Sequence, residues 1–495
     1  MLRYILIILF FISNGLSAFS QNNNPLRIEV ESNKIEDIYS LPIESKHLLV
    51  LEHLRKRAPK GEHWILEVFN KQMKKIGNKD LFLPRDFELF DHKLLGDTII
   101  WLCFAEPDGD NSSMMLYRLD LKTMFMRHIY IKGSRKAKLD RIEVLNNKLF
   151  IIGDNLKEIK SQVENVKLPS GIQLITVIIP EHSQIIDSKS DEKNNRVVII
   201  INGRKEPNKG LYYFEFTEDG DSFSKTKLIV SEKGNIVDGR LIETNTRDLL
   251  FMGTYSTHYS RQSSKRNIPV EGVYFGKISN KKFVFFNINK FSEFRNVYST
   301  LDYRTAIKAK QKQSNGKDVN LAFKLLIHEK YFKQGNNYVM VAESYYPEYH
   351  YENNFDSRGY MYQTQVFDGY KTSNCIVAAF SETGDLLWDN YMHINNIRSY
   401  SLQENILTFP EVDSSIVIAY YFDAHIVSKS VKGNDVVFKK TEEKIETIQE
   451  NVISEELGNI QAWYGKYFIV SGHQIIIGKN SKKRKVYFFN LVSFD

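Results

Sequence analysis

The chain of 495 residues is 42% hydrophobic and 26% charged, which is typical of a globular protein with enough apolar material for a sizeable core. Its formal net charge of +7 is small for this length, and its basic clusters alternate with acidic stretches, so no continuous basic stripe indicates a nucleic-acid-binding protein. After the N-terminal segment, no stretch approaches the ~18 apolar residues that a membrane-spanning helix needs.

The N-terminus predicts a cleavable secretory signal peptide over residues 1–20. A short positive segment around Arg3 precedes an unbroken apolar run over residues 4–12. Ala18 and Ser20 then place small residues where signal peptidase requires them. The alternative, an uncleaved anchor or a buried strand, is disfavoured by the polar Gln-Asn-Asn-Asn that follows. We therefore expect a periplasmic or secreted protein that is soluble after cleavage and has no transmembrane segment.

The rest of the chain has the texture of strands and turns. Eight apolar runs span residues 47–51, 98–104, 148–152, 196–201, 248–252, 338–342, 415–420 and 467–470. Alternating runs follow several of them, at residues 115–120, 211–216, 272–276, 375–380 and 486–490. The first set is apolar on both faces and is expected to be buried on both, whereas the second set is expected to be half exposed.

Repetition of one β-meander with this inner-to-outer polarity predicts an all-β fold, a β-propeller. Residues 21–495 then form a single propeller domain with seven or eight four-stranded blades, since the third and fourth units are poorly separated around residues 187–195. The last unit stops after its third strand. We expect residues 26–30 to supply the fourth strand and close the ring, because closure removes exposed sheet edges.

The two cysteines, Cys103 and Cys375, lie inside apolar, strand-like runs. An oxidising compartment permits a disulfide bond between them. Free buried thiols are favoured, because the propeller places the two residues in blades that are far apart around the ring.

Three long insertions, at residues 256–271, 288–320 and 343–374, are expected to emerge on one face of the ring. The first and third join second to third strands, and the other connects two blades. The connecting insertion has an apolar stripe of helical spacing from Phe294 to Leu301, ended by the polar residues 308–313 and Gly316. It therefore predicts a short helix, which we interpret as a lid on the blades in preference to a partner-binding helix.

The insertion at residues 343–374 is rich in aromatic side chains. Between Tyr345 and Tyr370, nine of 26 residues are Tyr or Phe, and seven of these nine are Tyr. Tyrosine combines a flat apolar ring with a polar rim, which suits a protein or carbohydrate ligand. The alternative is a loop that uses its tyrosines as a local core. The candidate ligand-binding residues are Tyr345, Tyr346, Glu348, Tyr349, His350, Tyr351, Tyr360 and Tyr362, together with His258, Tyr259 and Arg261.

Metal binding and catalysis find little support in the sequence. His258 and His350 could face each other near Glu348, but a metal site needs three or four converging ligands, and a hydrogen-bonded surface histidine is favoured. Sequence motifs of serine hydrolases, zinc proteases and nucleotide-binding loops are absent. We therefore expect no catalytic residues, no metal and no cofactor.

One short segment resembles a known propeller repeat. Residues 378–388 resemble the Ala…Thr-Gly…Trp repeat of quinoprotein-type propellers, with Thr383, Gly384 and Trp388 at matching spacing. The resemblance implies that the glycine serves a hairpin turn and that the tryptophan docks one blade on the next, without a quinone cofactor. The segment departs from the repeat at Phe380, where Asp is usual, and at Asp385, where Lys is usual.

The whole chain is also similar in layout to uncharacterised exported β-propeller-like proteins of Gram-negative bacteria, chiefly in residues 345–349, 367–370 and 386–389. Our first hypothesis is an exported binding or scaffold protein that uses its aromatic loops to bind an envelope protein or a carbohydrate. The alternative is a carbohydrate-active lyase or glycosidase on the same scaffold. A third hypothesis is a structural subunit of the envelope. The sequence does not determine the oligomeric state.

Overall fold

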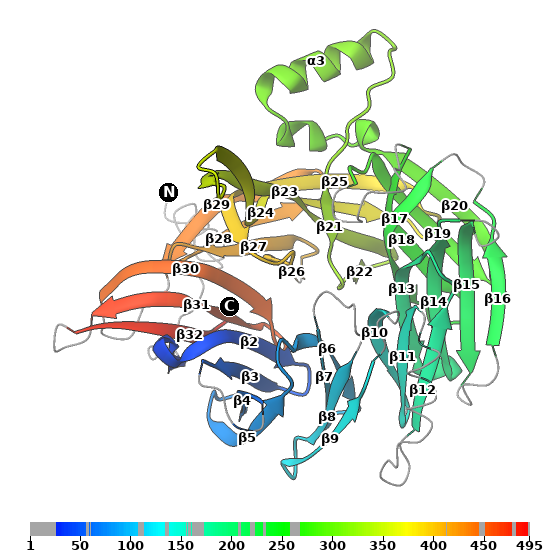
Figure 1. Ribbon diagram of the computed structural model, residues 1–495. Coiled ribbons are helices and arrows are strands. Elements are labelled where there is room, and N and C mark those ends of the chain that lie inside the picture. Colours follow the sequence, from blue (N-terminus) through cyan, green and yellow to red (C-terminus); the bar gives the residue numbers. More distant parts are fainter. Residues whose placement is uncertain are drawn as a thin grey trace, which may run out of the picture.

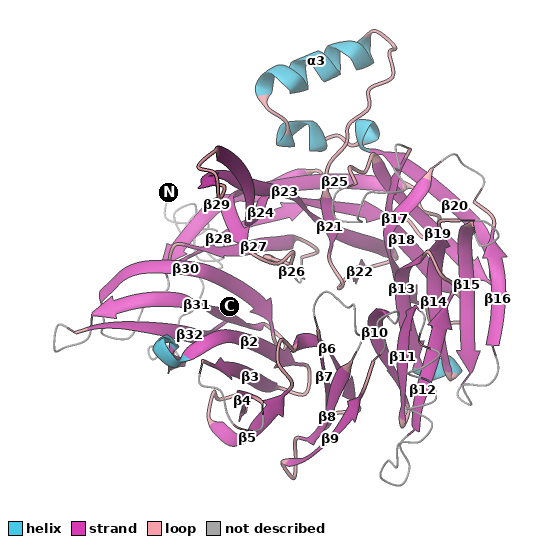
Figure 2. Ribbon diagram, viewed as in Figure 1, coloured by secondary structure: helices cyan, strands magenta, loops and turns pink. Residues whose placement is uncertain are grey.

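Eight successive sheets are arranged in a ring in the computed structural model, which confirms the predicted all-β propeller (Figures 1 and 2). We call the sheets blades 1 to 8 in chain order. The structure describes residues 26–55, 59, 61–106, 113–133, 138–154, 156, 160, 173–205, 209–217, 223–230, 234–257, 268–411, 413–444, 451–477 and 482–493.

The first four blades occupy the N-terminal half of the chain. Blade 1 contains β2 (Ile35–Ile43), β3 (His47–Leu54), β4 (Glu62–Phe69) and β5 (Lys75–Leu83). Blade 2 contains β6 (Glu88–Leu95), β7 (Ile99–Ala105), β8 (Met114–Asp120) and β9 (Phe125–Ile131). Blade 3 contains β10 (Lys138–Leu145), β11 (Lys148–Asp154) and β12 (Gln173–Ile179). Blade 4 contains β13 (Ser183–Asp191), β14 (Arg196–Gly203), β15 (Gly210–Thr217) and β16 (Phe223–Leu228).

The remaining four blades include the longest strands. Blade 5 contains β17 (Asn235–Glu243), β18 (Leu249–Ser256), β19 (Gly272–Ser279) and β20 (Lys282–Lys290). Blade 6 contains β21 (Leu325–Ile327), β22 (Phe332–Gln334), β23 (Asn337–Phe355), β24 (Met361–Phe380) and β25 (Leu386–Ser399). Blade 7 contains β26 (Ile406–Pro410), β27 (Ile416–Phe422), β28 (His425–Lys432) and β29 (Asp435–Lys444). Blade 8 contains β30 (Asn451–Ala462), β31 (Tyr467–Ile477), β32 (Lys483–Ser493) and β1 (Arg27–Glu31).

Two blades depart from four full strands in the described residues. In blade 6, β21 and β22 both pair with β23, one after the other, so they share the first-strand position. In blade 3, three strands are described, and β12 runs parallel to β11. A parallel neighbour requires the chain to cross back to the same end of the sheet, which explains the long connection between these strands.

The eight predicted apolar runs all lie on the second strand of a blade, where they are buried. In β3, for example, Leu48, Leu49, Val50 and Leu51 have no exposed surface. A second strand has neighbours on both sides within its own sheet, and the adjacent blades cover both faces of that sheet. Each fully buried aliphatic side chain contributes roughly 1.5–3 kcal/mol of transfer free energy. The cores therefore lie between blades, as in the apolar cluster that joins blades 1 and 2.

The ring is closed by the N-terminal strand, as the sequence predicts. Strand β1 pairs antiparallel with β32 as the outermost strand of blade 8. Arg27 reinforces this pairing through a hydrogen bond from Nη2 to Oε1 of Gln474 at 2.8 Å. The half-buried Ile28 and Val30 pack on an apolar cluster formed by blades 8 and 1.

The predicted helix exists, but its placement was wrong. The stripe from Phe294 to Leu301 contains a 3-10 turn, η5 (Val297–Thr300), preceded by η4 (Phe291–Glu293). The α-helix, α3 (Tyr303–Ser314), covers the polar segment that we expected to end it. Capping explains the shift, because the side chain of Asp302 accepts a hydrogen bond from the backbone N–H of Thr305.

The lid interpretation holds for the turns and not for α3. Phe291, Phe294 and Val297 are buried in the cluster between blades 5 and 6. In α3 only Ala309 is buried, and Tyr303 is 80% exposed. The helix stands away from the ring in Figure 1. The apolar stripe therefore anchors the connection, and the helix projects beyond it.

The insertion at residues 343–374 is not a loop. Its residues continue β23 and β24 as one long hairpin, paired in register from Tyr338 opposite Phe380 to Phe355 opposite Met361. The Tyr and Phe residues of both strands favour an extended conformation, which helps to explain why the segment remains paired.

The first and third insertions both contact the segment that directly follows the second. The N–H of Val270 donates to the carbonyl of Phe323 at 2.8 Å, and the N–H of Tyr345 donates to the carbonyl of Lys324 at 3.0 Å. That all three insertions emerge on one face stays a prediction, because residues 258–267 lie outside the described part of the chain.

Both cysteines are free and buried, in the second strand of blade 2 and the third strand of blade 6. Burial raises the pKa of each thiol. Within the described ranges, no helix has the length and apolar character needed to cross a membrane. The predicted signal peptide lies outside these ranges.

Candidate functional site

The outer part of the β23–β24 hairpin is amphipathic. Side chains alternate between the two faces of a strand, and directly paired residues share a face. Tyr349 pairs with Phe367, and Phe355 pairs with Met361. One face, which we call the aromatic face, carries Tyr345, Tyr349, Tyr351, Phe355, Met361, Phe367 and Tyr370, together with the polar residues Asn353, Gln363 and Gln365. The opposite, polar face carries Tyr346, Glu348, His350, Glu352, Asn354, Tyr362, Thr364, Val366 and Lys371.

The aromatic face contains a continuous chain of ring contacts near its base. Tyr345 contacts Tyr370 with ring centroids 5.6 Å apart, and Tyr370 contacts Phe367 at 5.0 Å. Phe367 contacts Tyr349 at 5.5 Å. The ring planes meet at 85°, 68° and 60°, so every contact is edge-to-face. Such pairs stabilise the hairpin, and they leave ring edges and faces pointing outward at different angles.

The aromatic face is not covered by other described residues. Tyr349 is 46% exposed, Tyr351 65%, Phe355 69% and Met361 61%. The hairpin also lacks strand neighbours in this region, because the described pairing of β24 with β25 extends outward only to Tyr370. A two-stranded hairpin is marginally stable alone, and an uncovered apolar face adds a cost in water. Exposed aromatic side chains gathered on one face in this way indicate a binding surface, although the Asn353–Gln363 pair interrupts the face before Phe355.

Charged pairs fix the geometry of the polar face. His350 bonds to Asp368 through Nδ1 at 2.6 Å and lies 3.2 Å from Glu352 through Nε2. These hydrogen bonds with Glu352 and Asp368 raise the pKa of His350. Both ring nitrogens therefore face carboxylates, an arrangement that favours the protonated imidazole.

Glu348 is held by two cations, whereas the partners of His350 are Asp368 and Glu352. Glu348 forms ion pairs with Lys371, at 3.2 Å, and with Arg398. Although partial burial opposes the change, these two partners lower the pKa of Glu348. Lys371 also lies over the ring of Tyr346, the residue opposite it in the hairpin.

The predicted site residues do not all lie on one surface. Tyr345 is buried at the hairpin base, so it supports the site and is not a contact residue. Tyr349 and Tyr351 lie on the aromatic face. Tyr346, Glu348, His350 and Tyr362 lie on the polar face, and Tyr360 is 71% exposed in the turn at the tip. His258, Tyr259 and Arg261 lie outside the described residues.

The sequence reasoning missed Phe355, Met361 and Phe367 as members of the same face. The signal was present, because the aromatic side chains at 345, 349, 351 and 355 are all an even number of residues apart, as on one side of a strand. Treating the segment as a loop hid this period.

A second set of polar residues, also missed, surrounds the axis of the ring. The first strands of blades 1–5 each contain a bulge, and the first paired residue after each bulge is charged. These residues are Asp37, Asp91, Arg141, Asp187 and Asp238. A bulge re-aims the side chain that follows it. We call these residues and their partners on neighbouring blades the axial belt.

The axial belt joins neighbouring blades. Asp91 of blade 2 accepts from the N–H of Ile142 of blade 3 at 3.4 Å. Arg141 of blade 3 donates to Asp187 of blade 4 at 3.1 Å. Asp187 in turn accepts from the N–H of Leu241 of blade 5 at 2.6 Å. The charged side chains therefore act as links between successive blades.

The same pattern continues into blades 6 and 7. Arg240 of blade 5 donates to the carbonyl of Ile327 at 2.9 Å. Glu343 of blade 6 accepts from the N–H groups of Asn405 and Ile406 of blade 7, at 2.7 and 2.9 Å. The carboxylate of Glu343 therefore gives a hydrogen-bond acceptor to two backbone N–H groups at the start of β26, the first strand of blade 7.

Burial dominates the electrostatics of the belt. It raises the pKa of the Asp187 carboxyl, against the opposing effect of Arg141 and Arg240, and it also raises the pKa of Asp91. Perturbed carboxyls of this kind occur at active sites and in structural ion-pair networks. Within the described part of the chain, no group of three or more His, Cys, Asp or Glu is placed to hold a metal ion.

Comparison with known proteins leaves the family open. No protein-family model matches the chain, and no curated protein matches it. Among solved structures, the polysaccharide lyase Uly1 is 9% identical, with 96% of this chain and 93% of that chain covered and a TM-score of 0.34. An α-L-arabinanase of Penicillium chrysogenum is 8% identical, with 94% and 98% covered and a TM-score of 0.33. The β-propeller domain of the Trilobed protease from Pyrococcus furiosus is 7% identical, with 93% and 96% covered and a TM-score of 0.32. We draw no functional conclusion from similarities this distant.

Proposed function

We propose that this chain is an exported binding protein and that the aromatic face of its β23–β24 hairpin docks a partner protein. The observation that carries the proposal is the long hairpin, whose aromatic face stays exposed from Tyr349 to Met361. Rigid blades hold the hairpin base, so the binding residues project from a fixed scaffold.

Two features favour a protein partner over a carbohydrate. A sugar ring stacks best on a flat aromatic surface, whereas the rings of Tyr349, Phe367 and Tyr370 meet edge-to-face. The outer hairpin also presents strand edges that pair with no further described strand. A partner can add a strand to such an edge while its apolar side chains cover the rings.

The alternative, a carbohydrate-active enzyme, receives weaker support. Charged side chains surround the axis, as a catalytic pocket would require. However, Asp91, Asp187 and Glu343 each accept a backbone N–H group from the next blade. These carboxylates therefore have a structural role that already accounts for their positions.

Site-specific photo-crosslinking tests the proposal. A photoreactive phenylalanine analogue is placed at Tyr351 on the aromatic face, or at Asn354 on the polar face, in cells that produce the protein. We expect one discrete protein to crosslink from position 351 and not from position 354. Tyr351 is exposed and Asn354 is half-buried, and both lie in the outer hairpin away from the cores between blades, which limits any effect on folding.

A variant pair completes the test. The substitutions Tyr349→Ser, Tyr351→Ser and Phe355→Ser together should abolish co-purification of the crosslinked protein. Glu352→Ser with Asn354→Ser, on the opposite face, should retain it. Equal crosslinking from both faces, or retention of the partner by the triple variant, would contradict the proposal.

A further inference from the structure

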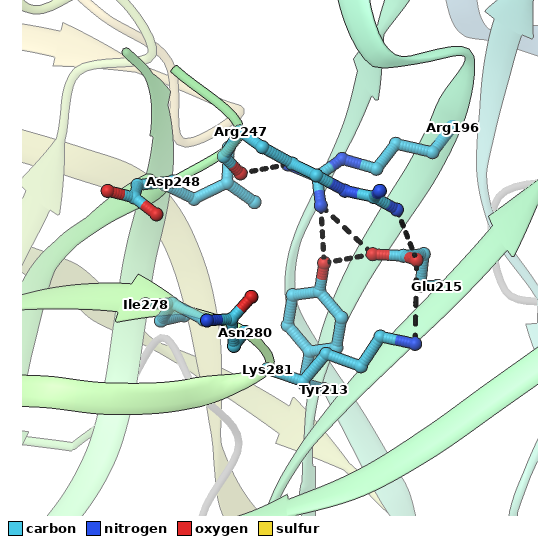
Figure 3. Close-up of a pocket in the computed structure, with 9 residues that line it drawn as sticks. Arg196, Tyr213, Glu215, Arg247, Asp248, Ile278, Asn280 and Lys281 are labelled. Carbon is cyan, nitrogen blue, oxygen red and sulfur yellow. Dashed lines mark hydrogen bonds and ion pairs between the residues drawn. The ribbon is translucent and has the colours of Figure 1, made fainter.

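A polar cavity separate from the hairpin lies between blades 4 and 5 (Figure 3). Its walls include Arg196 at the start of β14, Tyr213 and Glu215 of β15, Arg247 before β18, and Asn280 and Lys281 in the turn between β19 and β20. The cavity has a volume of about 270 Å³. This volume lies just below the ~300–1,000 Å³ that is typical of small-molecule pockets, so a ligand would be small.

Buried ion pairs hold the floor of the cavity rigid. Arg196 is buried and bonds through Nε to Asp191 at 2.8 Å and through Nη1 to Glu215 at 2.9 Å. Tyr213 donates to the same carboxylate of Glu215 at 2.7 Å. Figure 3 shows Arg196, Tyr213 and Lys281 converging on Glu215. Because Arg196 fills its hydrogen bonds with these partners, it contributes a fixed positive charge beneath the cavity.

A pinned turn presents Arg247 at the edge of the cavity. The backbone carbonyl of Arg247 accepts from Nη2 of Arg196 at 2.5 Å. The hydroxyl of Thr244 donates to the carbonyl of Asp248 at 2.7 Å, which closes the turn. The Arg247 side chain is 66% exposed and contacts Glu215 through Nη2 at 3.2 Å. A planar guanidinium has five donors, so this side chain retains donors for a second carboxylate.

The opposite wall is equally well ordered. Asn280 and Lys281 both adopt left-handed backbone conformations, with φ of 47° and 64°. Two consecutive residues of this kind form a tight turn whose twist matches the flanking strands. Lys281 bonds to Ser224 at 2.8 Å and lies 3.6 Å from Glu215. The turn therefore fixes an ammonium group and an amide at the cavity wall.

Positive charge exceeds negative charge in this network. Its cations are Arg196, Arg247, Lys277 and Lys281, and its carboxylates are Asp191, Glu215 and Asp248. Every carboxylate already has a cation within 3.2 Å. Four cations and three carboxylates leave the network with a formal charge of +1, because Arg196, Arg247 and Lys281 share Glu215. Two of the four cations, Arg247 and Lys281, line the cavity.

We infer that this cavity is a binding site for a small carboxylate, on the scale of a single sugar acid. The ligand carboxylate would accept hydrogen bonds from Arg247 and Lys281, and the Asn280 amide would bond to a ligand hydroxyl. Leu249 and Ile278 supply an apolar wall for the carbon skeleton. The site shares no residue with the aromatic face, so a negative result for one proposal leaves the other unaffected.

Isothermal titration calorimetry with D-glucuronate as the probe tests the inference, and D-glucose is the uncharged control of the same size. We expect saturable 1:1 binding of glucuronate, no heat of binding with glucose, and weaker binding at high salt. Arg247→Gln should weaken affinity at least tenfold, because a hydrogen bond to a charged group is worth about 1.5–3 kcal/mol and each tenfold change corresponds to 1.4 kcal/mol.

The matched control is Lys282→Gln, which removes an adjacent charge that does not line the cavity. Its affinity for glucuronate should equal that of the wild type. Arg247 and Lys282 are both exposed, so neither substitution should impair folding. Absence of glucuronate binding, equal binding of glucose, or unchanged affinity in Arg247→Gln would overturn the inference.

Discussion

The substitution Glu343→Gln tests whether the axial belt holds the blades together. Glu343 is 1% exposed, and its Oε1 accepts from Nε2 of His328 at 2.7 Å as well as from the N–H groups of Asn405 and Ile406. Glutamine preserves the shape and removes the charge. If three hydrogen bonds to a charged acceptor each weaken by about 1 kcal/mol, the free energy of unfolding falls by about 3 kcal/mol.

The effect should depend on pH through His328. Burial and the nearby charge of Arg240 both lower the pKa of His328. The hydrogen bond with Glu343 and the negative charges of Glu404 and Glu343 raise it by more, so the pKa of His328 is raised overall. A raised pKa in the folded state stabilises the protein fully below the ordinary value of ~6.5, and this contribution is lost as pH rises through the folded-state pKa. The stability difference between wild type and Glu343→Gln should therefore be largest at low pH.

Urea unfolding followed by tryptophan fluorescence at pH 6 and at pH 9 measures both effects. With a slope of about 3 kcal/mol/M, the expected midpoint shift is about 1 M. Glu352→Gln, on the exposed hairpin, serves as the control and should leave the midpoint unchanged. A shift in Glu343→Gln no larger than in this control, or a difference that does not change with pH, would refute the reasoning.

Two further predictions concern the thiols and the closing strand. Cys103 and Cys375 are free and fully buried, and burial raises the pKa of both thiols. Neither should therefore react with a thiol reagent in the native state, and both should react after unfolding in denaturant. One fast-reacting thiol in the native protein would disagree with the structure. Val30→Asp places a charge in the half-buried contact between β1 and the blade 8 cluster, and it should reduce the free energy of unfolding by roughly 2 kcal/mol. Glu31→Ala, at an exposed position of the same strand, should leave it unchanged. Equal thermal unfolding temperatures for the two variants would argue against closure by β1.

The sequence predicts the strands that are buried on both faces most reliably. All eight apolar runs lie on second strands, because burial on both sides leaves a continuous apolar pattern that few other structures produce. The closing strand over residues 26–30 was also predictable, since an unfinished last blade leaves an edge that needs a partner.

The functional surfaces were less predictable for a physical reason. The aromatic segment was identified by composition, but its paired conformation depends on a register that only the two long strands together define. The axial belt was not predicted because its charged residues come from separate blades. The bulges also interrupt the two-residue alternation of each first strand, so the sequence does not show which side chains face the axis. In the helical segment, the apolar stripe was correct, yet the cap at Asp302 determined where α3 begins.

Closure of the ring by β1 has a consequence for how the protein folds. Arg27 and Asn490 are paired in register although 463 residues separate them. During synthesis β1 must therefore wait for β32, which can already pair with β31. Contacts this distant in sequence form slowly, because the entropy of closing the loop is lost before the contact is gained. Until then β32 has an open edge, and the unclosed ring is the state most exposed to aggregation and to capture by chaperones.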